Sequence, residues 1–430
     1  MTRAGHAPRS LRGKSGKAPG GQPGHPGRTL ALRATPGAVH EHAPAACGRC
    51  GAAFAPEAPR APVAGERRQV FELPPLALVC TEHRLAERTC ASCGAVSRGA
   101  YPPEARTTVQ YGPGVLALAV SLTAQHLLPV QRAADVVSAL IGHALSPATL
   151  LAAEGRVAAA VAPVVQRIRA GLARAPVVHF DETGFFVRQQ RWWLHVSSTR
   201  ALASYTAHPR RGTRAHDAIG LLPAYAGTAL HDAYESYFTY RACRHTLCGV
   251  HLQRELLFLE EEEEAGAATA AWARPLRRAL ETMRRATVRA RDAGRAALDA
   301  RSRRRYARRF DHLLAAGEAA EPPPTAAGPR GGRRRRTPGA QLLFRLRKYR
   351  GAVLRFVEDL AVPFDNSEAE RDLRMMKVEQ KVSGGFRTAP GAHTFCALRS
   401  YLVTARKQGV EAFGAIRGAL TGTPFIPAVP

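Results

Sequence analysis

The sequence predicts an α+β or α/β fold, in which a mixed sheet is interrupted by a helical insertion and preceded by two smaller N-terminal parts. Three observations lead to this prediction. Short β-branched runs lie in the middle of the chain, helix-forming and arginine-rich segments flank them, and paired cysteines lie near the N-terminus. At 430 residues, the chain is long enough for two or three domains that each bury a core.

The chain is strongly basic, with 62 Lys and Arg against 34 Asp and Glu and a formal net charge of +28. Such a charge favours a polyanionic partner, of which nucleic acid is the commonest. A genome rich in Arg codons would contribute to the excess. However, the 14 arginines between Arg274 and Arg309 accompany only Glu281, Asp292 and Asp299, and codon bias alone would not deplete acids there. We therefore expect a DNA-facing helical insertion in this region.

The sequence also bears on where the protein works. The N-terminal stretch MTRAGHAPRSLRGKSGKAPG lacks the apolar centre of a signal peptide, and the apolar run 114–124 is too short to cross a bilayer. Two CxxC pairs in a protein that is not exported indicate metal ligands or redox groups rather than disulfides. We expect a cytoplasmic, nucleoid-associated protein with no membrane partner.

Two N-terminal parts are expected. Residues 1–40 are rich in Gly, Pro and basic residues, which is typical of a flexible basic arm. Residues 41–100 have the two-knuckle cysteine spacing of a tetrahedral structural Zn²⁺ site, which predicts a zinc-ribbon-like module. The interval between the pairs is longer than in the usual ribbon, and a redox pair or an empty site are the alternatives. The expected zinc ligands are Cys47, Cys50, Cys90 and Cys93.

Residues 101–172 are rich in Ala, Leu and Val, with Pro and Gly between the apolar runs. This pattern predicts a helical region, and the part from about 113 to 170 is a candidate helix-turn-helix for DNA binding. Ser146 followed by Pro147 predicts the capped start of a long helix.

Residues 173–255 and 345–411 are expected to form the core around the mixed sheet. The order of elements is β-β-β-α-β, which is that of a ribonuclease H-like sheet, where the first and fourth strands are neighbours. Asp181 and Asp232 end those two strands and would lie side by side. In chain order, the expected elements are strands 176–181, 191–198 and 202–208, a helix at 214–225 and a strand at 227–234.

A third carboxylate would come from a helix near residue 370. Asp365 or Asn366 can cap this helix, and Glu370 lies in its first turns. The positions 4, 7 and 11 residues after Glu370 share its helix face, and all of them are basic. A carboxylate beside cations that hold strand phosphates suits an enzyme that cuts phosphodiester bonds. The three basic residues are Arg374, Lys377 and Lys381.

Three such acids suit Mg²⁺ or Mn²⁺, because hard cations prefer carboxylates and water as ligands. Two ions can clamp an in-line displacement at phosphorus without a protein nucleophile. The alternative is that Asp181 and Asp232 are ordinary strand-end acids and that Glu370 is an exposed helix residue. From the spacing alone, the same roles are open to Glu182, Asp217, Glu235, Asp365 and Glu368.

Three further segments complete the chain. Residues 256–344 are expected to form the basic helical insertion, with a linker or exposed loop at 321–339, and residues 412–430 a C-terminal tail. The segment CRHTLCGVH contains Cys243, Cys248 and His251. These are too few ligands for a second zinc site, which remains an alternative, and we expect a structural core with His251 hydrogen-bonded near the active site.

Five segments, in this order, resemble bacterial DDE transposases of the insertion sequence 66 family: FDETGFF, WWLHVSST, RRGTRAHDAIGLLP, GTALHDAY and DNSEAERDLRMMKVEQKVSGGFRT. GKAPGGQPGHPG resembles the segment ahead of the family's zinc region, so the resemblance spans roughly residues 13–411. The family usually has a longer helical region before that segment, which suggests a truncated copy or a shifted start. The family's usual Asn-Asn is Asn366-Ser367 here.

The resemblance implies a DDE triad of Asp181, Asp232 and Glu370, and it favours Glu370 over Glu368. It implies metal-dependent cleavage of DNA at element ends and transfer of the 3′-hydroxyl ends to target DNA. Asp181 would bridge two Mg²⁺ or Mn²⁺ ions, and Asp232 and Glu370 would each complete the coordination shell of one ion. Strand phosphates would be held by Arg374, Lys377 and Lys381.

The partners expected on this basis are double-stranded DNA at element ends and target, further copies of the chain in a homo-oligomer on DNA, and accessory transposition proteins. Two other functions compete with this one. The first is a ribonuclease H-like nuclease that cuts without strand transfer. The second is a catalytically inactive, transposase-derived zinc protein that only binds DNA.

Overall fold

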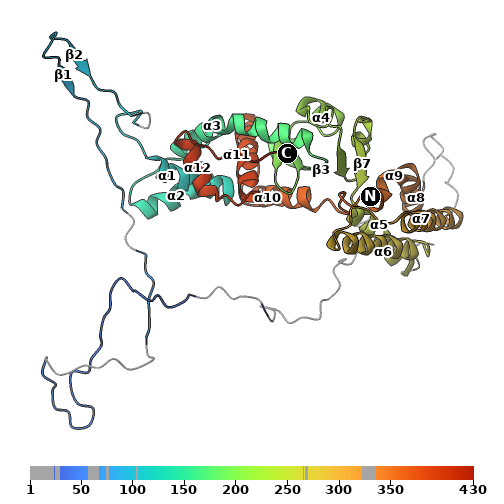
Figure 1. Cartoon of the computed structure of the whole chain (residues 1–430), viewed down its shortest axis with the longest axis horizontal. Coiled ribbons are helices and arrows are strands. Elements are labelled where there is room, and N and C mark those ends of the chain that lie inside the picture. The colour runs from blue at the N-terminus through green and yellow to red at the C-terminus, as the bar shows by residue number, and fades with distance from the viewer. Residues whose placement is uncertain are drawn as a thin grey trace. The chain divides into compact units, whose positions relative to one another are not determined.

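The computed structural model describes residues 24, 30–56, 67–73, 77–102, 105–264, 266, 270–321 and 336–430 (Figure 1). Most of the expected basic arm and most of the expected loop at 321–339 lie outside these residues. The chain divides into two compact units, one of Arg12–Val79 and one of Cys80–Pro430 together with Met1–Leu11.

Each unit has short β structure near its cysteines. In the unit Arg12–Val79, Ala46 forms an isolated antiparallel bridge with Ala53. In the larger unit, β1 (Glu87–Thr89) and β2 (Val96–Arg98) form a two-stranded antiparallel sheet. These elements are the β structure in the described part of the region predicted to bind zinc.

A five-stranded mixed sheet, in the order β5-β4-β3-β6-β7, forms the centre of the larger unit. The first three strands pair antiparallel, whereas β6 and β7 are added parallel to β3. The first strand of the sheet is therefore a neighbour of the fourth, which is consistent with a ribonuclease H-like core. The strands are β3 (Val177–Val187), β4 (Gln190–Ser198), β5 (Ala203–His208), β6 (Thr228–His231) and β7 (Arg244–Leu247).

The prediction that the first strand ends at Asp181 is wrong. β3 continues to Val187, because the residues after Asp181 pair with β4 in a long antiparallel hairpin. The strand that ends beside Asp181 is the parallel neighbour β6. The helix expected at 214–225 is also shorter, since α4 (Thr213–Ile219) stops at Gly220, whose φ of 75° is the left-handed conformation that ends helices.

Alternate side chains of β3 face two different cores. Val178 and Phe180 face a core built with α3, α11 and α12, whereas Phe185 and Val187 face α10 and α11. The predicted C-terminal tail at 412–430 contains α12, which is buried in the first of these cores. These helices are α3 (Pro147–Arg174), α10 (Ser367–Ser383), α11 (Ala389–Lys407) and α12 (Ala412–Leu420).

The helical region before the sheet contains α1 (Pro113–Val120), a π-helical turn (Ser121–Gln125), α2 (Val130–Ile141) and α3. The predicted cap of α3 is confirmed, because the Ser146 hydroxyl accepts the N–H of Thr149 at 3.1 Å. Among the described helices, α3 is long and apolar enough to span a membrane by length and composition. The core helix of a soluble protein meets the same criterion, and the residues of α3 buried in the core include Val157, Val161, Val164 and Ile168.

The insertion between the two parts of the core has a hydrophobic core of its own, and its helix α9 also contacts the edge strand β7. At its base, the N–H of Gly249 donates to the carbonyl of Phe364 at 2.7 Å, so the chain leaves and re-enters the sheet region at one place. The helices are α5 (Gly249–Glu264), α6 (Ala273–Asp292), α7 (Ala300–Ala320), α8 (Pro338–Lys348) and α9 (Arg350–Glu358).

Candidate active site

The parallel pairing of β3 with β6 brings Asp181 and Asp232 to neighbouring positions. His179 pairs with Leu230 in the register of these strands, and Asp181 and Asp232 lie two residues further along each chain. A step of two residues along a strand returns to the same face of the sheet. The two carboxylates predicted from the sequence therefore follow matched positions on adjacent strands.

Helix α10 supplies Glu370 from its first turn. Leu373 and Met376 are buried in the core that holds Phe185 of β3, and the Gln380 amide donates to the Gly184 carbonyl at 2.7 Å. These contacts dock α10 along the face of β3 on which Asp181 lies, because positions 181 and 185 share one side of a strand. The N-terminal end of the helix, which holds Glu370, is thereby directed toward Asp181.

Asn366 joins the start of α10 to β3 and to the residue that follows β7. Its amide nitrogen donates to the Phe180 carbonyl at 2.9 Å, its amide oxygen lies 3.0 Å from Nδ1 of His179, and its backbone N–H donates to Sγ of Cys248 at 3.3 Å. The sequence predicted Asn366 or Asp365 as the helix cap. The Asn366 side chain binds β3 instead, and the Asp365 carboxylate accepts the N–H of Ser367 at 3.0 Å.

Burial and like charges act together on the acids of this site. Burial raises the pKa of Asp181 to about 7, and the negative charges of Glu182, Asp232 and Glu370 add to that rise. Burial also raises the pKa of Asp232. Each of these acids would be stabilised as a carboxylate by a nearby cation. A donor set made of carboxylate oxygens fits Mg²⁺ or Mn²⁺.

Glu182, a rival for a catalytic role, is fully engaged with other side chains. It accepts from Nε of Arg211 at 2.7 Å and from the hydroxyl of Tyr237, and its side chain is 1% exposed. The other rivals also have protein partners among the described residues: Tyr240 for Asp217, Lys348 for Glu235, Ser367 for Asp365, and Lys407 for Glu368.

Arg211 is a residue of this site that the sequence did not single out, since its only signal was the basic run RRGTR. Its guanidinium lies 3.9 Å from the ring centre of Tyr234 and 4.9 Å from that of Trp193. Nη2 of Arg211 is also 3.9 Å from Oδ2 of Asp232. The two aromatic rings and Glu182 hold this cation beside the acidic cluster, which consists of Asp181 and the acids whose charges act on it, Glu182, Asp232 and Glu370.

A cavity of about 310 Å³ opens beside Asp232. Its lining combines acids, arginines and the first turn of α5, so a charged ligand could reach the carboxylates from this side. The polar and charged residues that line it include Arg211, Asp232, Cys248, His251, Glu255 and Arg345.

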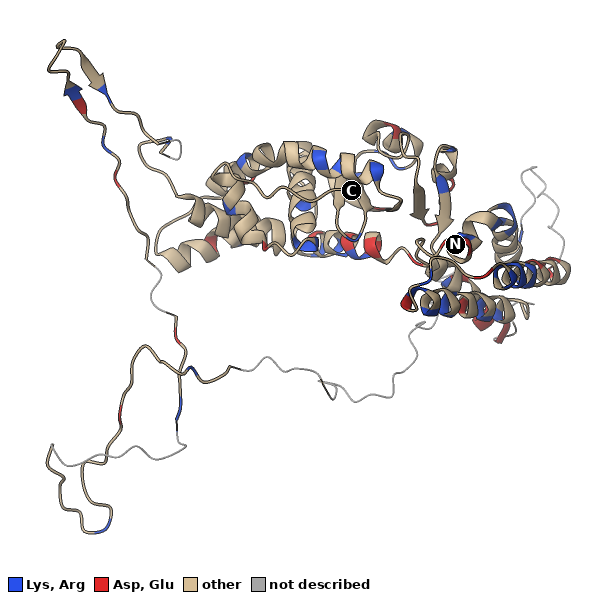
Figure 2. Cartoon of the chain, viewed as in Figure 1, with Lys and Arg blue, Asp and Glu red and all other residues tan. Residues whose placement is uncertain are grey.

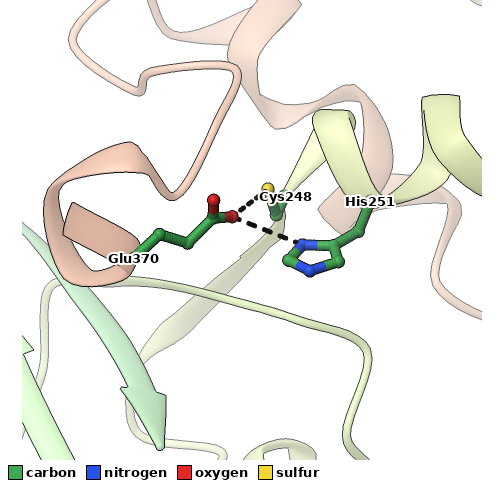
Figure 3. Close-up of side chains that lie close together, drawn as sticks. All are labelled: Cys248, His251 and Glu370. Atoms are coloured by element: carbon green, nitrogen blue, oxygen red, sulfur yellow. Dashed lines mark hydrogen bonds and ion pairs between the residues drawn. The ribbon is translucent and has the colours of Figure 1, made fainter. Parts of the chain in front are cut away.

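Cys248 and His251 lie next to Glu370 (Figure 3). Oε1 of Glu370 is 3.7 Å from Sγ of Cys248 and 3.6 Å from Nδ1 of His251. We expected His251 to be hydrogen-bonded near the active site. At Nδ1 this expectation is not met, because the 3.6 Å separation from Oε1 of Glu370 is too long for a hydrogen bond and Nδ1 has no other hydrogen-bond partner among the described residues. Cys243 lies apart, against the carbonyl of Tyr240.

The basic stripe predicted on α10 is exposed. Arg374, Lys377 and Lys381 follow Glu370 along the helix, and within the described chain none of them forms an ion pair. Their charges are therefore available to an external anion. They lie on the element that also supplies Glu370.

The two CxxC pairs form the same local turn. Gly51 N–H donates to the Cys47 carbonyl at 2.9 Å, and Gly94 N–H donates to the Cys90 carbonyl at the same distance. Both glycines have a positive φ, 75° and 71°, as this turn requires. Backbone N–H groups of the following residues hydrogen-bond to each sulfur and lower the pKa of Cys47 and Cys90, which favours the thiolate that zinc binds. The four-cysteine zinc site stays a prediction.

Comparison with known proteins bears on the whole of this region. The model of the family described as "Transposase IS66 family" matches residues 108–394, which is more than half of the chain and contains Asp181, Asp232 and Glu370. No functionally curated protein matches the chain significantly. The chain therefore belongs to the IS66 family of transposases.

Proposed function

We propose that this chain is a DDE transposase with a ribonuclease H-like catalytic core. It cleaves DNA at element ends with the help of divalent cations and transfers the 3′-hydroxyl ends to target DNA. The observation that carries the proposal is the matched position of Asp181 and Asp232 on adjacent strands, with Glu370 supplied by a helix docked on the same face. Membership of a transposase family supports the same reaction.

Asp181, Asp232 and Glu370 would hold two Mg²⁺ or Mn²⁺ ions. When bound, the ions would activate the attacking oxygen and stabilise the leaving oxygen of an in-line displacement. Burial of Asp181 limits access of bulk water to the reacting groups, and Asn366 fixes the direction from which Glu370 approaches. Arg211 would offset negative charge on the substrate beside Asp232.

Two basic surfaces would hold the DNA strands. On α10, Arg374, Lys377 and Lys381 are exposed on the helix that carries Glu370, so they are suited to phosphates near the cut. The second surface is on the insertion, where Figure 2 shows Lys and Arg along α6 and α7.

The arginines of α6 and α7 differ in their partners. On α6, Arg274, Arg277, Arg284 and Arg285 form ion pairs with Glu260, Glu264 or Glu281, whereas Arg278, Arg289 and Arg291 form none with a described residue. On α7, five exposed arginines lie opposite the buried face, and none of them forms an ion pair with any described residue. We therefore assign contact with the phosphate backbone to α7. This α7 stripe consists of Arg301, Arg304, Arg305, Arg308 and Arg309.

The N-terminal parts would add binding rather than chemistry. A structural Zn²⁺ ion held by the two CxxC turns would fix a small module that can lie on DNA. The helices before the sheet would contribute further DNA contacts, and several copies of the chain would assemble on the element ends. The thiolate-stabilising turns at Cys47 and Cys90 support the zinc assignment.

Nicking of DNA that carries the element ends, measured in the presence and absence of Mg²⁺, tests the proposal. Asp181→Ala and Asp232→Ala should abolish nicking and retain DNA binding in a gel-shift assay. Asp217→Asn is the matched control, since this acid bonds to Tyr240 and lies outside the cluster. Mg²⁺-dependent nicking that survives in Asp181→Ala would overturn the proposal.

Joining of cleaved ends to a target plasmid separates the transposase from its competitors. Cleavage without joined products would indicate a nuclease. DNA binding without any cleavage would indicate an inactive DNA-binding derivative.

A further inference from the structure

We propose that Cys248, His251 and Glu370 form a Zn²⁺ site that competes with the Mg²⁺ centre for Glu370. The competition rests on the proposed function, whereas the binding of zinc does not. The three ligand atoms lie within 4.8 Å of one another, and the residues come from the position just after β7, the first turn of α5 and the first turn of α10 (Figure 3).

The spacing of the ligand atoms is close to that around a tetrahedral zinc ion, and the thiol of Cys248 donates a long hydrogen bond to Oε1 of Glu370 when no ion is bound. With zinc–ligand distances of about 2.0–2.3 Å, neighbouring ligand atoms of a tetrahedron lie about 3.3–3.6 Å apart. The observed separations from Oε1 of Glu370 are 3.7 Å to Sγ of Cys248 and 3.6 Å to Nδ1 of His251. Small shifts of three side chains would complete the coordination.

His251 presents an unused ligand atom. Its Nδ1 is buried and, among the residues that the structure describes, has no hydrogen-bond partner, although it faces a carboxylate. A buried polar atom without a partner is costly and rare in folded proteins. A metal ion between Nδ1 and Glu370 would satisfy it.

Backbone N–H groups are directed at the sulfur of Cys248, as they are at Cys47 and Cys90, although Cys248 is buried and those two cysteines are not. Backbone N–H groups of Val250 and His251, two and three residues later, hydrogen-bond to it, as the N–H groups at the equivalent positions do after Cys47 and Cys90. The backbone N–H of Asn366 adds a further bond at 3.3 Å. Burial raises the pKa of the Cys248 thiol to about 12 and these donors offset only part of that rise, so the thiol would give up its proton on binding the metal.

The kinds of ligand select the metal. Thiolate and imidazole groups suit Zn²⁺, whereas Mg²⁺ avoids them. Binding would replace the thiol proton of Cys248, which would leave to solvent, while the neutral imidazole and the carboxylate bind as they are. The cavity of about 310 Å³ is lined by Cys248 and His251, so water can reach the fourth position of the ion.

Zinc at this site would remove Glu370 from the Mg²⁺ centre. One carboxylate oxygen, Oε1, faces both Cys248 and His251, and a zinc ion bound there would hold this oxygen, which the Mg²⁺ centre also needs. Zinc should therefore inhibit Mg²⁺-dependent cleavage at concentrations that fill this site.

Metal binding to the full-length protein tests the site without any activity. Zinc per chain is counted after dialysis, and Co²⁺ is titrated alone while the thiolate-to-cobalt absorption is recorded. Cys248→Ala should bind one zinc ion fewer than wild type and lose part of that absorption. Cys243→Ala is the matched control, since this buried cysteine contacts Tyr240 and should change neither reading.

His251→Gln provides a second variant, because this half-exposed side chain can be replaced with little risk to folding. Loss of a group that only supports a metal ligand weakens metal binding about 10–100-fold. Loss of the ligand itself in His251→Gln should therefore weaken zinc binding at this site by at least about 100-fold. Equal zinc content and equal cobalt spectra in wild type and Cys248→Ala would overturn the site.

Inhibition is measured as cleavage with zinc divided by the same protein's cleavage without it. Wild type should be inhibited, and His251→Gln should require at least tenfold more zinc. Zinc that binds at this site without slowing cleavage would refute the competition. If no variant cleaves DNA, the proposed function fails, while the zinc and cobalt measurements still decide the site.

Discussion

Oδ1 of Asn366 lies 3.0 Å from Nδ1 of His179, although the two residues are 187 positions apart in the chain. This contact and the bond from Asn366 to the Phe180 carbonyl join the start of α10 to the strand that carries Asp181. This buried amide, together with the packing of Leu373 and Met376 on β3, therefore sets the position of Glu370 relative to Asp181.

Asn366→Ala should lower the free energy of unfolding by about 2–3 kcal/mol, because it leaves His179 and the Phe180 carbonyl buried without their partner. It should also weaken Mg²⁺-dependent cleavage. Chemical unfolding and nicking are measured on the same preparation. Ser367→Ala, which loses only a bond to Asp365, should change both by much less, and equal effects of the two variants would contradict the role of Asn366.

Asp181→Asn should stabilise the metal-free protein at pH 8, because it removes a carboxylate that burial and neighbouring charges disfavour. An increase in melting temperature of at least about 2 °C is expected. Addition of Mg²⁺ should raise the melting temperature of wild type and leave that of Asp181→Asn nearly unchanged. Equal responses of the two proteins to Mg²⁺ would show that the ion binds elsewhere.

Glu154 offers a test of pH dependence away from the acidic cluster. Burial raises its pKa above the ordinary 4.5, and its carboxyl group contacts the hydroxyl of Thr123 in the π-helical turn. Because the folded state holds this proton more tightly than the unfolded state, stability falls as pH rises above 4.5. Glu154→Gln should therefore raise the melting temperature at pH 7–8, and the difference from wild type should vanish near pH 4. A constant difference across this range would contradict the assignment.

The α7 stripe is tested by the salt dependence of DNA binding. Replacing Arg304 and Arg308 together by Gln should reduce the slope of log K against log salt by about 1 for each lost phosphate contact. Arg284→Gln with Arg285→Gln is the matched control, because it removes the same charge from α6 but both arginines already pair with Glu281. If the two double variants changed the slope of log K against log salt equally, the assignment of DNA contact to α7 rather than α6 would be wrong.

Gly249→Ala should destabilise the junction between the sheet and the insertion. A Cβ atom there would lie 2.2 Å from the buried ring of Phe364, which cannot move without disturbing the core. The free energy of unfolding should fall by about 1–3 kcal/mol, as is usual for overpacking. In contrast, the Cβ atom added by Gly351→Ala in α9 would meet no atom within 4 Å. This variant should raise the free energy of unfolding by about 0.5–1 kcal/mol.

The sequence predicted the parts of the fold that follow from local patterns. The start of α3 at Pro147 follows from the capping serine before it, and the alternation of apolar residues indicated four of the five strands. The length of β3 was missed, because Asp181, Glu182 and Gly184 interrupt the run of strand-forming residues, and only pairing with β4 keeps the chain extended to Val187. β7 was missed because its residues, Arg-His-Thr-Leu, show neither an apolar run nor an alternation of apolar and polar side chains.

The site was predictable only to the level of candidate acids. Spacing alone could not separate Asp181 from Glu182, because adjacent residues of a strand face opposite sides and the sequence does not say which side is covered by α10. Arg211 and Asn366 act through contacts with residues distant in sequence, so no local pattern reveals them. The ligand that makes Cys248 and His251 a metal site, Glu370, comes from another helix.

The hydrogen bond between Gly249 and Phe364 has a consequence for how such a chain can change over time. It joins the two ends of residues 250–363, and this segment also packs on the edge strand β7 through α9. Within the described chain, helices α6 and α7 pack on α5, α8 and α9 and not on the sheet, so they could be lengthened, shortened or exchanged without shifting the three acids. The chain can thus acquire a new DNA-binding surface while its proposed chemistry stays the same.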